Sequence, residues 1–289
     1  MQPFPYQGSK RVIADAVVGL LPATCSTLIE PFAGSAAVSL VARSMASTEH
    51  IVLNDLNKPL IELWRAILCD PEALAKKYEQ LFNSGVADPA GNYLAVRDQF
   101  NATHRPELLL YLLYRCVKSA VRYNTAGEFN QSADKRRLGA KPSVVARNLA
   151  GAAALLDGAT VLRSVDYSSV LQIATPEDVV YLDPPYQGTS GQRNQRYVSG
   201  IDFGAFVLAL RALHVRNIPY LLSYDGRTGT KTYGQALPED LGLVRVDVDA
   251  GPSTQATLLG RSERTIEALF ISPALQHLLG PKGHALVAS

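Results

Sequence analysis

The chain has 289 residues, of which 47% are apolar and 19% charged, a composition that excludes an intrinsically disordered protein and allows one large hydrophobic core or two smaller ones. The net charge of +2 is too small to indicate a nucleic-acid partner by itself, but residues 115–147 carry eight Lys or Arg and only two acids. A basic segment of this kind is typical of phosphate-binding proteins, although a solvated helix face would have the same composition.

The cysteines indicate neither a disulfide framework nor a metal site. Cys25, Cys69 and Cys116 lie far apart and form no Cys-x-x-Cys pair, so we expect free thiols in a reducing compartment and no bound metal. The N-terminal segment is polar and interrupted by proline, unlike a signal peptide, and no apolar run approaches the length of a membrane span. We therefore expect a cytoplasmic protein with no membrane partner.

The first predicted helix, residues 10–21, follows a loop that is rich in proline and aromatic residues. Apolar residues recur in it at helical spacing, and Ser9 is a candidate N-cap. In the loop, Tyr6 precedes Lys10 by four residues, so that a ring and a cation could hold a ligand between them. Taken alone, the pattern fits a hydrophobic plug with a solvated lysine better.

The next segment, residues 26–46, is predicted to form a strand, a turn of small residues and a helix. The turn, Phe32-Ala33-Gly34-Ser35-Ala36, would let a ligand lie close to the backbone and to the free N–H groups of the helix. It contains one glycine and is not the Gly-x-Gly-x-x-Gly fingerprint, so it does not indicate a pyrophosphate site. By itself this turn is weak evidence for a nucleotide ligand.

The second predicted strand, residues 50–53, ends in Asn54-Asp55-Leu56-Asn57. In nucleotide-binding α/β folds an acid at the end of this strand binds ribose hydroxyls. Asn57 can cap the helix predicted over residues 57–68. We expect Asp55 to face a ribose and Asn57 to be the cap.

The alternation of strands and helices then stops until residue 160. Helical patterns occupy residues 70–83, 92–101, 107–121 and 143–156. We therefore predict that residues 58–156 form an inserted target-recognition domain. Residues 1–57 and 157–280 would form the catalytic domain, and residues 281–289 a flexible tail.

Within the insertion, residues 122–130 are rich in turn formers and suited to a hairpin, and a basic cluster follows them. Amide and guanidinium groups can bind base edges and phosphates, and aromatic rings can stack on bases. The predicted DNA contacts of this region are Arg122, Tyr123, Asn124, Asn130, Lys135, Arg136 and Arg137.

The alternation resumes with strands over residues 160–163, 178–182 and 218–224, a helix over 201–216, and an antiparallel pair over 243–249 and 265–271. The middle one of the three strands ends in Asp183-Pro184-Pro185-Tyr186, where open α/β sheets bind their ligands. Proline donates no N–H, so the carbonyls here can face a ligand. A carboxylate, rigid carbonyl groups and an aromatic ring suit a planar amine, although Asp-Pro-Pro can also be a simple strand stop. The polar segment that follows contains Arg193 and Arg196, which could hold phosphates.

These motifs and their order resemble those of the Dam-like, D12-class N6-adenine DNA methyltransferases. The matching segments are Tyr6-x-Gly8-Ser9-Lys10, Glu30-Pro31-Phe32-x-Gly34, Asn54-Asp55-x-Asn57, Arg122-Tyr123-Asn124-x-x-Gly127-Glu128-Phe129-Asn130 and Asp183-Pro184-Pro185-Tyr186. The resemblance covers residues 4–271. It implies an α/β fold, in which a Rossmann-like methyltransferase sheet of seven strands carries an inserted, mainly helical target-recognition domain.

The resemblance also implies S-adenosyl-L-methionine as methyl donor and, as acceptor, N6 of an adenine flipped out of double-stranded DNA. The expected catalytic residues are Asp183, Pro184, Pro185 and Tyr186. The donor site is expected to consist of Tyr6, Lys10, Glu30, Phe32, Gly34, Asp55, Asp166 and Asp183.

The sequence departs from the family pattern at three positions. Ala36 replaces the second glycine of the usual Phe-x-Gly-x-Gly, and Tyr6 stands where tryptophan is common, so we expect weaker donor binding at most. Ala126 stands where GATC-specific members carry a basic residue, which argues against GATC as the recognition sequence.

Three other functions compete with this interpretation. An RNA N6-adenine methyltransferase shares the chemistry but differs in its insertion, and an N4-cytosine methyltransferase more often carries Ser before Pro-Pro. A catalytically silent DNA-binding module would not need the intact Asp183 to Tyr186 segment. Besides DNA, a restriction endonuclease or a defence system is a candidate partner.

Overall fold

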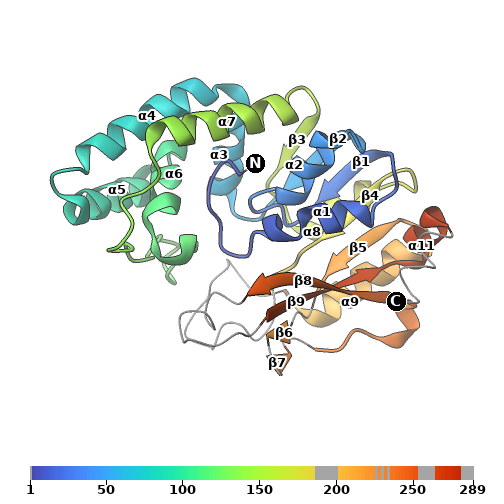
Figure 1. The fold of residues 1–289 in the computed structure, drawn as a ribbon. Coiled ribbons are helices and arrows are strands. Elements are labelled where there is room, and N and C mark those ends of the chain that lie inside the picture. Colours follow the sequence, from blue (N-terminus) through green and yellow to red (C-terminus); the bar gives the residue numbers. More distant parts are fainter. Residues whose placement is uncertain are drawn as a thin grey trace.

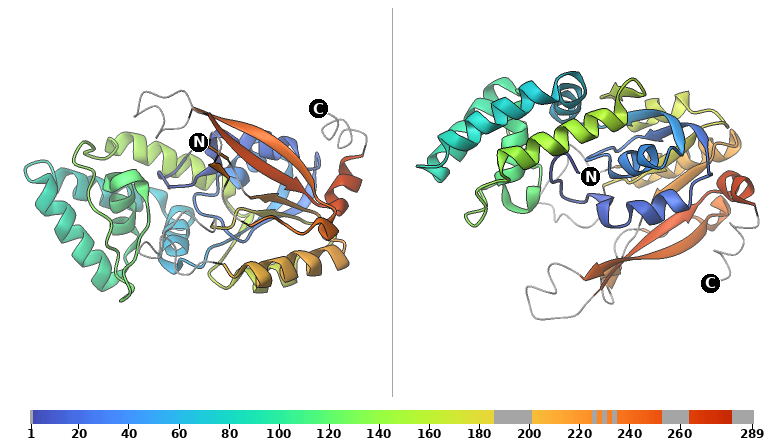
Figure 2. Two further views of the ribbon diagram at one scale, coloured as in Figure 1. Left: turned by 90° about the horizontal axis from the view of Figure 1, so that it is seen from below. Right: turned by 45° about the horizontal axis from the view of Figure 1, so that its top comes forward.

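The computed structural model describes residues 2–185, 201–224, 227–228, 231–232, 235–252 and 264–280, and the statements below concern these residues. A central β-sheet with helices on both faces occupies one side of the molecule, and a group of helices lies beside it (Figure 1). The views of Figure 2 show the same side-by-side arrangement. No helix in these ranges is long and apolar enough to cross a membrane.

Five parallel strands form one side of the sheet, from the edge strand β3 inwards. In spatial order they are β3 (Thr160–Arg163), β2 (Thr48–Asn54), β1 (Cys25–Glu30), β4 (Val179–Leu182) and β5 (Tyr220–Ser223). All four residues of β4 and of β5 are buried, as expected for parallel strands that are covered on both faces.

Antiparallel strands complete the sheet. Strand β9 (Arg264–Ile271) pairs with β5, and β8 (Val244–Pro252) pairs with the other edge of β9. A hairpin of two short strands, β6 (Arg227–Thr228) and β7 (Lys231–Thr232), also joins β9. The predicted seven-stranded sheet and its antiparallel pair are confirmed by the longer strands, whereas the short hairpin was not predicted.

Helices cover both faces of the sheet, over two separate apolar clusters. One cluster contains residues of α1 (Ala14–Gly19), α2 (Ala37–Ser44) and α11 (Pro273–Leu279), and the other contains residues of α8 (Tyr167–Ile173) and α9 (Phe203–Val215). Helix α8 was not predicted: no element was expected between the strands over residues 160–163 and 178–182. A single 3-10 turn, η3 (Glu239–Leu241), precedes β8.

The helix predicted over residues 10–21 is wrong as a single element. The chain forms a 3-10 turn, η1 (Lys10–Val12), and α1 begins only after Ile13. Ser9 does not cap this turn through its side chain. Its hydroxyl instead accepts a hydrogen bond from Ser35, 2.8 Å away.

The inserted segment is helical, as predicted. Its elements are α3 (Lys58–Cys69), α4 (Pro71–Ser84), α5 (Pro89–Thr103), α6 (Pro106–Arg115), the 3-10 turn η2 (Val117–Ser119) and α7 (Pro142–Leu156). The five α-helices each carry proline in the first turn, where its fixed φ suits a helix and its missing N–H costs nothing. This explains why α5 begins at Pro89, three residues before the predicted start.

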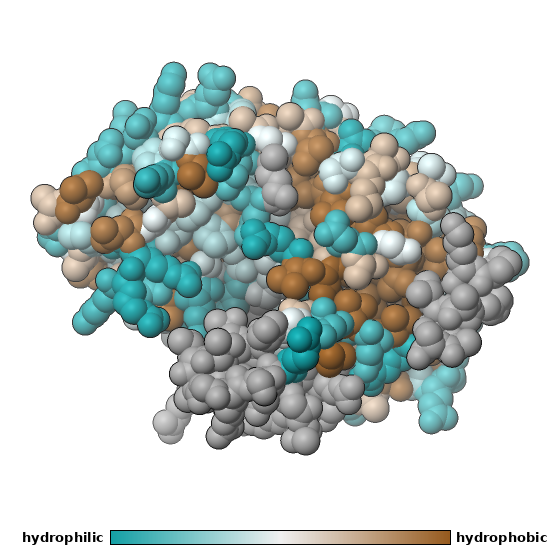
Figure 3. Space-filling view, viewed as in Figure 1, coloured by the Kyte–Doolittle hydropathy of each residue, from teal (hydrophilic) through white to brown (hydrophobic). Residues whose placement is uncertain are grey.

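The apolar core is continuous between the sheet and the inserted helices. One cluster extends from Leu28 and Ile51 in the sheet through Trp64 of α3 to Leu112 of α6. The boundary predicted at residues 57 and 58 and the second boundary at 156 and 157 therefore stay predictions. Hydrophilic side chains cover much of the helical group on the face drawn in Figure 3, whereas apolar ones gather nearer to the sheet.

Candidate functional site

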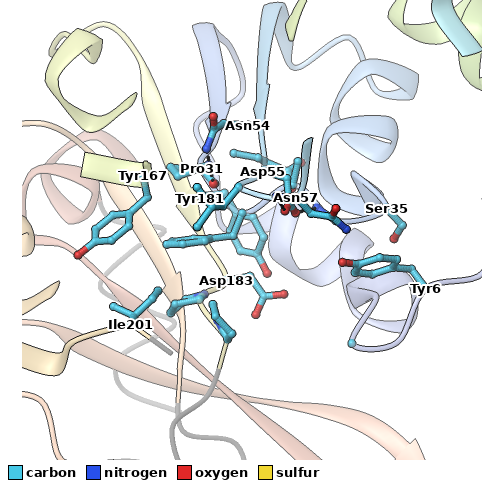
Figure 4. A pocket seen from close by; sticks show the side chains of 18 of the residues that line it. Tyr6, Pro31, Ser35, Asn54, Asp55, Asn57, Tyr167, Tyr181, Asp183 and Ile201 are labelled. Carbon is cyan, nitrogen blue, oxygen red and sulfur yellow. Dashed lines mark hydrogen bonds between the residues drawn. The ribbon is translucent and has the colours of Figure 1, made fainter. Parts of the chain in front are cut away.

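A cavity of about 590 Å³ lies at the carboxyl ends of β1, β2 and β4 (Figure 4). Strand β1 is flanked by β2 on one side and β4 on the other, so the order of the strands reverses here. Open α/β sheets bind ligands at such a switch point, because the loops that follow the two neighbouring strands diverge to opposite faces and leave a crevice. The fold therefore places the cavity where a ligand is expected.

The cavity gathers most of the residues predicted to bind a donor or to act in catalysis. All eight predicted donor-site residues line it, together with Pro184 and Pro185. Tyr186, Arg193 and Arg196 lie outside the described residues. Tyr167, Tyr181 and Ile201 also line the cavity but were not predicted, because no motif marks them.

The turn of small residues after β1 packs against the N-terminal loop. Gly34 has φ +50°, and a Cβ added there would lie 3.1 Å from the ring of Tyr6. The carbonyl of Gly34 accepts a hydrogen bond of 2.9 Å from the indole of Trp64. Only glycine avoids both the unfavourable φ and the close contact, so the chain needs it here.

Ala36, which replaces the family's second glycine, also has a positive φ, of +49°. It is fully buried at the N-cap of α2. A non-glycine residue in the left-handed region costs on the order of 1–2 kcal/mol. The substitution therefore strains the backbone beside the cavity but does not fill the cavity itself.

Gly34→Ala should weaken ligand binding at this site, and Gly158→Ala is its matched control. Gly158 has φ +64°, and a Cβ there would meet nothing within 4 Å. Both variants should lose about 1 kcal/mol of stability through the positive φ. Only Gly34→Ala should also displace Tyr6 and reduce the affinity for S-adenosyl-L-methionine, the expected donor, on the order of tenfold, as measured by calorimetric titration. Equal affinities of the two variants would contradict this role of Gly34.

Asp55 connects the loops after β1 and β2. Its carboxylate accepts hydrogen bonds from the backbone N–H groups of Gly34, at 3.1 Å, and Asn57, at 2.9 Å. Burial raises the pKa of Asp55 to about 6, although these two hydrogen bonds oppose the shift. Asp55 thus shapes the cavity wall besides lining it.

Two asparagines hold the same loops in place. Asn57 was predicted to cap α3, but its side chain does not do so. Its Oδ1 instead accepts a hydrogen bond of 3.1 Å from the hydroxyl of Tyr123. Asn54, which is buried, donates to the carbonyls of Pro31 and Val165 and accepts from the N–H of Val165. Asn54 belongs to the Asn54-Asp55-x-Asn57 segment, and as a polar residue at the end of an apolar strand it could have been predicted to hold these loops.

Glu30 lines the cavity and also binds the first turn of α2. Its Oε1 accepts a hydrogen bond of 2.7 Å from the N–H of Ser39 and another from the Ser39 hydroxyl. Burial raises the pKa of Glu30 to about 7, and the charge of Asp183 adds to the shift. A carboxylate near the first turn also interacts favourably with the helix dipole.

Asp183 forms an ion pair with the buried Lys10. Lys10 Nζ lies 2.9 Å from Asp183 Oδ1 and 3.6 Å from Glu267 Oε2 on β9. Burial raises the pKa of Asp183 to about 6, Lys10 opposes this, and the charge of Glu267 adds to it. Glu267 was not predicted, since it lies far from every motif and reaches Lys10 only through the sheet.

The far wall of the cavity consists of aromatic rings and α8. The rings of Phe32 and Tyr167 lie 5.3 Å apart, and Tyr167 meets Phe206 of α9 edge to face at 5.9 Å. Asp166 lines the cavity too, but its Oδ1 accepts hydrogen bonds from the backbone and hydroxyl of Ser168 and so caps α8.

The cavity is strongly acidic. Among the described residues that line it, Lys10 is the single cation, whereas the acids are Glu30, Asp55, Asp166, Asp183 and Asp202. Such a lining suits a cationic ligand and disfavours a pyrophosphate. This agrees with the missing Gly-x-Gly-x-x-Gly fingerprint.

The predicted hairpin is confirmed in the inserted segment. Tyr123 and Phe129 pair antiparallel, and Gly127, with φ +79°, donates its N–H to the carbonyl of Asn124. The three-residue loop with glycine in the left-handed region is a common hairpin form. Asn101 of α5 holds the hairpin through two hydrogen bonds to the backbone of Phe129.

The predicted DNA contacts are divided between this hairpin, the cavity and the surface. Tyr123 lines the cavity rather than the surface. The Asn124 side chain accepts from the N–H groups of Ala126 and Glu128 and donates to the Glu128 carboxylate, so it is part of the turn. Arg122 is half-buried. The others, Asn130, Lys135, Arg136 and Arg137, are exposed.

A second, shallower depression of about 490 Å³ lies between α5 and the hairpin. It is lined mainly by polar groups, including those of Arg97, Asn101 and Asn130. Nothing in the sequence marked Arg97, because an isolated arginine in a helix is usually solvated.

Comparisons with known proteins agree with this geometry. A family model described as "D12 class N6 adenine-specific DNA methyltransferase" matches residues 6–232. A DNA N-6-adenine-methyltransferase of Escherichia phage P1 is 30% identical over 77% of this chain and 29% of its own length. A DNA adenine methylase of Haemophilus influenzae is 28% identical over 69% of the chain and 68% of its own length. The modification methylase StsI of Streptococcus sanguinis is 27% identical over 66% of this chain and 29% of its own length.

Proposed function

The chain belongs to the D12 class of N6-adenine-specific DNA methyltransferases, and on that premise we propose that it transfers a methyl group from S-adenosyl-L-methionine to N6 of an adenine in double-stranded DNA. The observation that carries the proposal is the acidic cavity at the switch point, with Asp183 and Pro184 at its edge. RNA methylation and a silent DNA-binding module are not favoured, since the family and the relatives are named for DNA adenine methylation.

The residues around the cavity fit this donor. Its sulfonium and ammonium groups are cations, which suit a wall with five acids and one lysine. The aromatic rings of Tyr6, Phe32 and Tyr167 offer apolar faces for its adenine, and Asp55 lies at the end of β2, where the ribose is expected. When bound, the donor supplies an electrophilic methyl group.

We propose that Asp183 and Pro184 activate the acceptor amine. The lone pair of an exocyclic amine is delocalised into the ring, so the nitrogen is a poor nucleophile. A carboxylate oxygen of Asp183 and the Pro184 carbonyl would accept the two amine hydrogens and localise the lone pair on nitrogen. Lys10, 2.9 Å from Oδ1, would fix the orientation of the carboxylate. Alignment and electrostatics then lower the barrier without a covalent enzyme intermediate.

A stacked adenine cannot reach the end of β4, so the base would be flipped out of the duplex. We propose that Tyr186 stacks on the flipped base and that Arg193 and Arg196 bind phosphates, as predicted from the sequence. The hairpin and the exposed cations Lys135, Arg136 and Arg137 would bind DNA. Asn124 would stabilise the hairpin turn instead of reading a base, because its side chain already holds the turn. Duplex DNA is thus the proposed partner, and the name of the Streptococcus relative supports a restriction endonuclease as a further one.

The test is transfer of a labelled methyl group. Purified protein with radiolabelled S-adenosyl-L-methionine should label duplex DNA, and digestion to nucleosides should recover the label as N6-methyl-2′-deoxyadenosine. Structured RNA of matched length should acquire at most background label. Label on RNA but not on DNA would overturn the proposal, and sequencing of the methylated DNA would define the recognition sequence.

A further inference from the structure

Two carboxylates share one buried ammonium beside the proposed acceptor position. Lys10 is 8% exposed, and its Nζ lies 2.9 Å from Asp183 Oδ1 and 3.6 Å from Glu267 Oε2. Asp183 follows β4, whereas Glu267 lies on β9, two strands away in the sheet. The sheet therefore brings Asp183 and Glu267 to Lys10, although both acids are far from this lysine in the sequence.

Glu267 does not line the cavity, so its influence on a ligand passes through Lys10 and through its charge. When ionised, Glu267 adds one negative charge to the group that contains Lys10 and Asp183. Removing it makes this group more positive by one unit. The side chains of Asp183 and Glu267 are only 19% and 18% exposed, so solvent screens this charge less than it would at the surface.

The proposed donor and its demethylated product differ in the charge on their sulfur atom. S-adenosyl-L-methionine carries a positive charge on sulfur, and S-adenosyl-L-homocysteine has an uncharged thioether there. Their adenosine, ammonium and carboxylate groups are the same. A negative group near the sulfur should therefore strengthen binding of the donor and leave binding of the product almost unchanged.

We infer that Glu267 is a positioning residue that adds negative charge beside the Lys10–Asp183 pair and so favours the cationic donor over its neutral-sulfur product. The inference rests on the proposed function, because it needs this donor. Strand β9 contains none of the motifs that resemble the family, and the inference gives it a role in donor selection and in product release. Without the charge of Glu267 the preference for the donor would be smaller, and fresh donor would then displace the product less readily.

The inference is tested with Glu267→Gln, which removes the charge but keeps the shape. The dissociation constants of S-adenosyl-L-methionine and S-adenosyl-L-homocysteine are measured by isothermal titration calorimetry at pH 7.5 and constant ionic strength. The variant should bind the donor on the order of tenfold more weakly, and the product within about threefold of the wild-type affinity. Glu267→Asp, which keeps the charge, should retain most of the preference for the donor.

The matched control is Asp249→Asn. Asp249 lies on the neighbouring strand β8, opposite Ile266, and pairs with Arg264 in an exposed position. This substitution removes the same charge at the surface and should leave both dissociation constants unchanged. A parallel loss of preference in this control would overturn the inference.

The pH dependence of binding provides a second readout. Asp183, whose pKa burial raises to about 6, faces Lys10, Glu267 and Glu30. Protonation of Glu30, whose pKa is raised to about 7, and then of Asp183 would make the site less negative, so the wild-type preference for the donor should decrease as the pH falls from 8 through about 6. A preference that stays constant between pH 5 and pH 8 would contradict the inference.

The remaining outcomes separate the two proposals. If the wild-type protein binds neither compound, the proposed function itself fails. If it binds both but Glu267→Gln keeps the wild-type ratio of dissociation constants, only the inference fails. An equal weakening of both ligands would show that Glu267 merely supports the local structure, and this also overturns the inference. Thermal unfolding of each variant establishes that the comparison is made between folded proteins.

Discussion

Asp183→Asn should reduce the rate of methyl transfer on the order of a thousandfold while the protein stays folded. In the proposed mechanism the carboxylate accepts a hydrogen of the adenine amine and stabilises the positive charge that develops on nitrogen. An amide has the same shape but no charge, and one of its two polar atoms is a donor. The measurement is single-turnover methylation of duplex DNA with labelled donor at saturating concentrations.

The same residue should determine the acid side of the pH–rate profile. Burial raises the pKa of Asp183 to about 6, with Lys10 opposing the shift. Because the ionised form is the active one, the wild-type rate should fall as the pH decreases through about 6. For Asp183→Asn the residual rate should lack this dependence.

Stability provides the control for this substitution. A carboxyl with a raised pKa in the folded state stabilises the protein when protonated and loses that contribution as the pH rises through about 6. At neutral pH the asparagine variant therefore avoids the cost of a buried charge but removes the carboxylate that lies 2.9 Å from Lys10 Nζ. We expect the unfolding temperature to change by only a few degrees. A folded variant with wild-type activity would contradict the assignment.

Asp55→Ala should weaken donor binding on the order of a hundredfold and lower the free energy of unfolding by about 2–3 kcal/mol. The carboxylate satisfies the backbone N–H groups of both Gly34 and Asn57, so its loss leaves two donors without their partner and loosens two walls of the cavity. Calorimetric titration with S-adenosyl-L-methionine and thermal unfolding measure the two effects.

Two further variants show whether these effects depend on the position. Asp55→Asn keeps one acceptor oxygen and should have an intermediate effect on both quantities. Asp157→Ala, at the exposed C-terminal end of α7, removes the same side chain where it lines no cavity. It should bind the donor like the wild-type protein. If Asp55→Ala did likewise, the proposed role of Asp55 at the donor site would be wrong.

Local sequence was sufficient to predict the elements that flank the cavity. The run Val179–Leu182 forms β4 because four consecutive apolar residues followed by Asp-Pro-Pro can be buried only as a strand that ends there. The hairpin at residues 122–130 forms because Gly127 permits the left-handed turn. Helix α8 was missed because its seven residues are too few to show a clear helical period.

The side-chain partners were less predictable. Ser9, Asn57 and Asn124 were each assigned a role that their residue type favours, yet each bonds to a partner that the sequence does not indicate. For Ser9 and Asn57 the partner belongs to a distant segment of the chain. Asn124 was predicted to bind DNA bases, but its side chain bonds to the backbone of its own turn. A polar side chain can satisfy its hydrogen bonds in several ways, and burial selects among them only once the fold exists.

The sequence by itself determined the fold class, the residues that gather at the ends of β1, β2 and β4, and the family, because buried strands and the turns after them depend on local residue types. Only the tertiary structure decided that Glu30 binds α2, that Tyr123 reaches the cavity, and that Glu267 shares Lys10 with Asp183. The physical reason is that electrostatic and hydrogen-bond partners depend on distances in space. Asp183 follows β4 and Glu267 lies on β9, and these two strands become neighbours of β5 only when the sheet assembles.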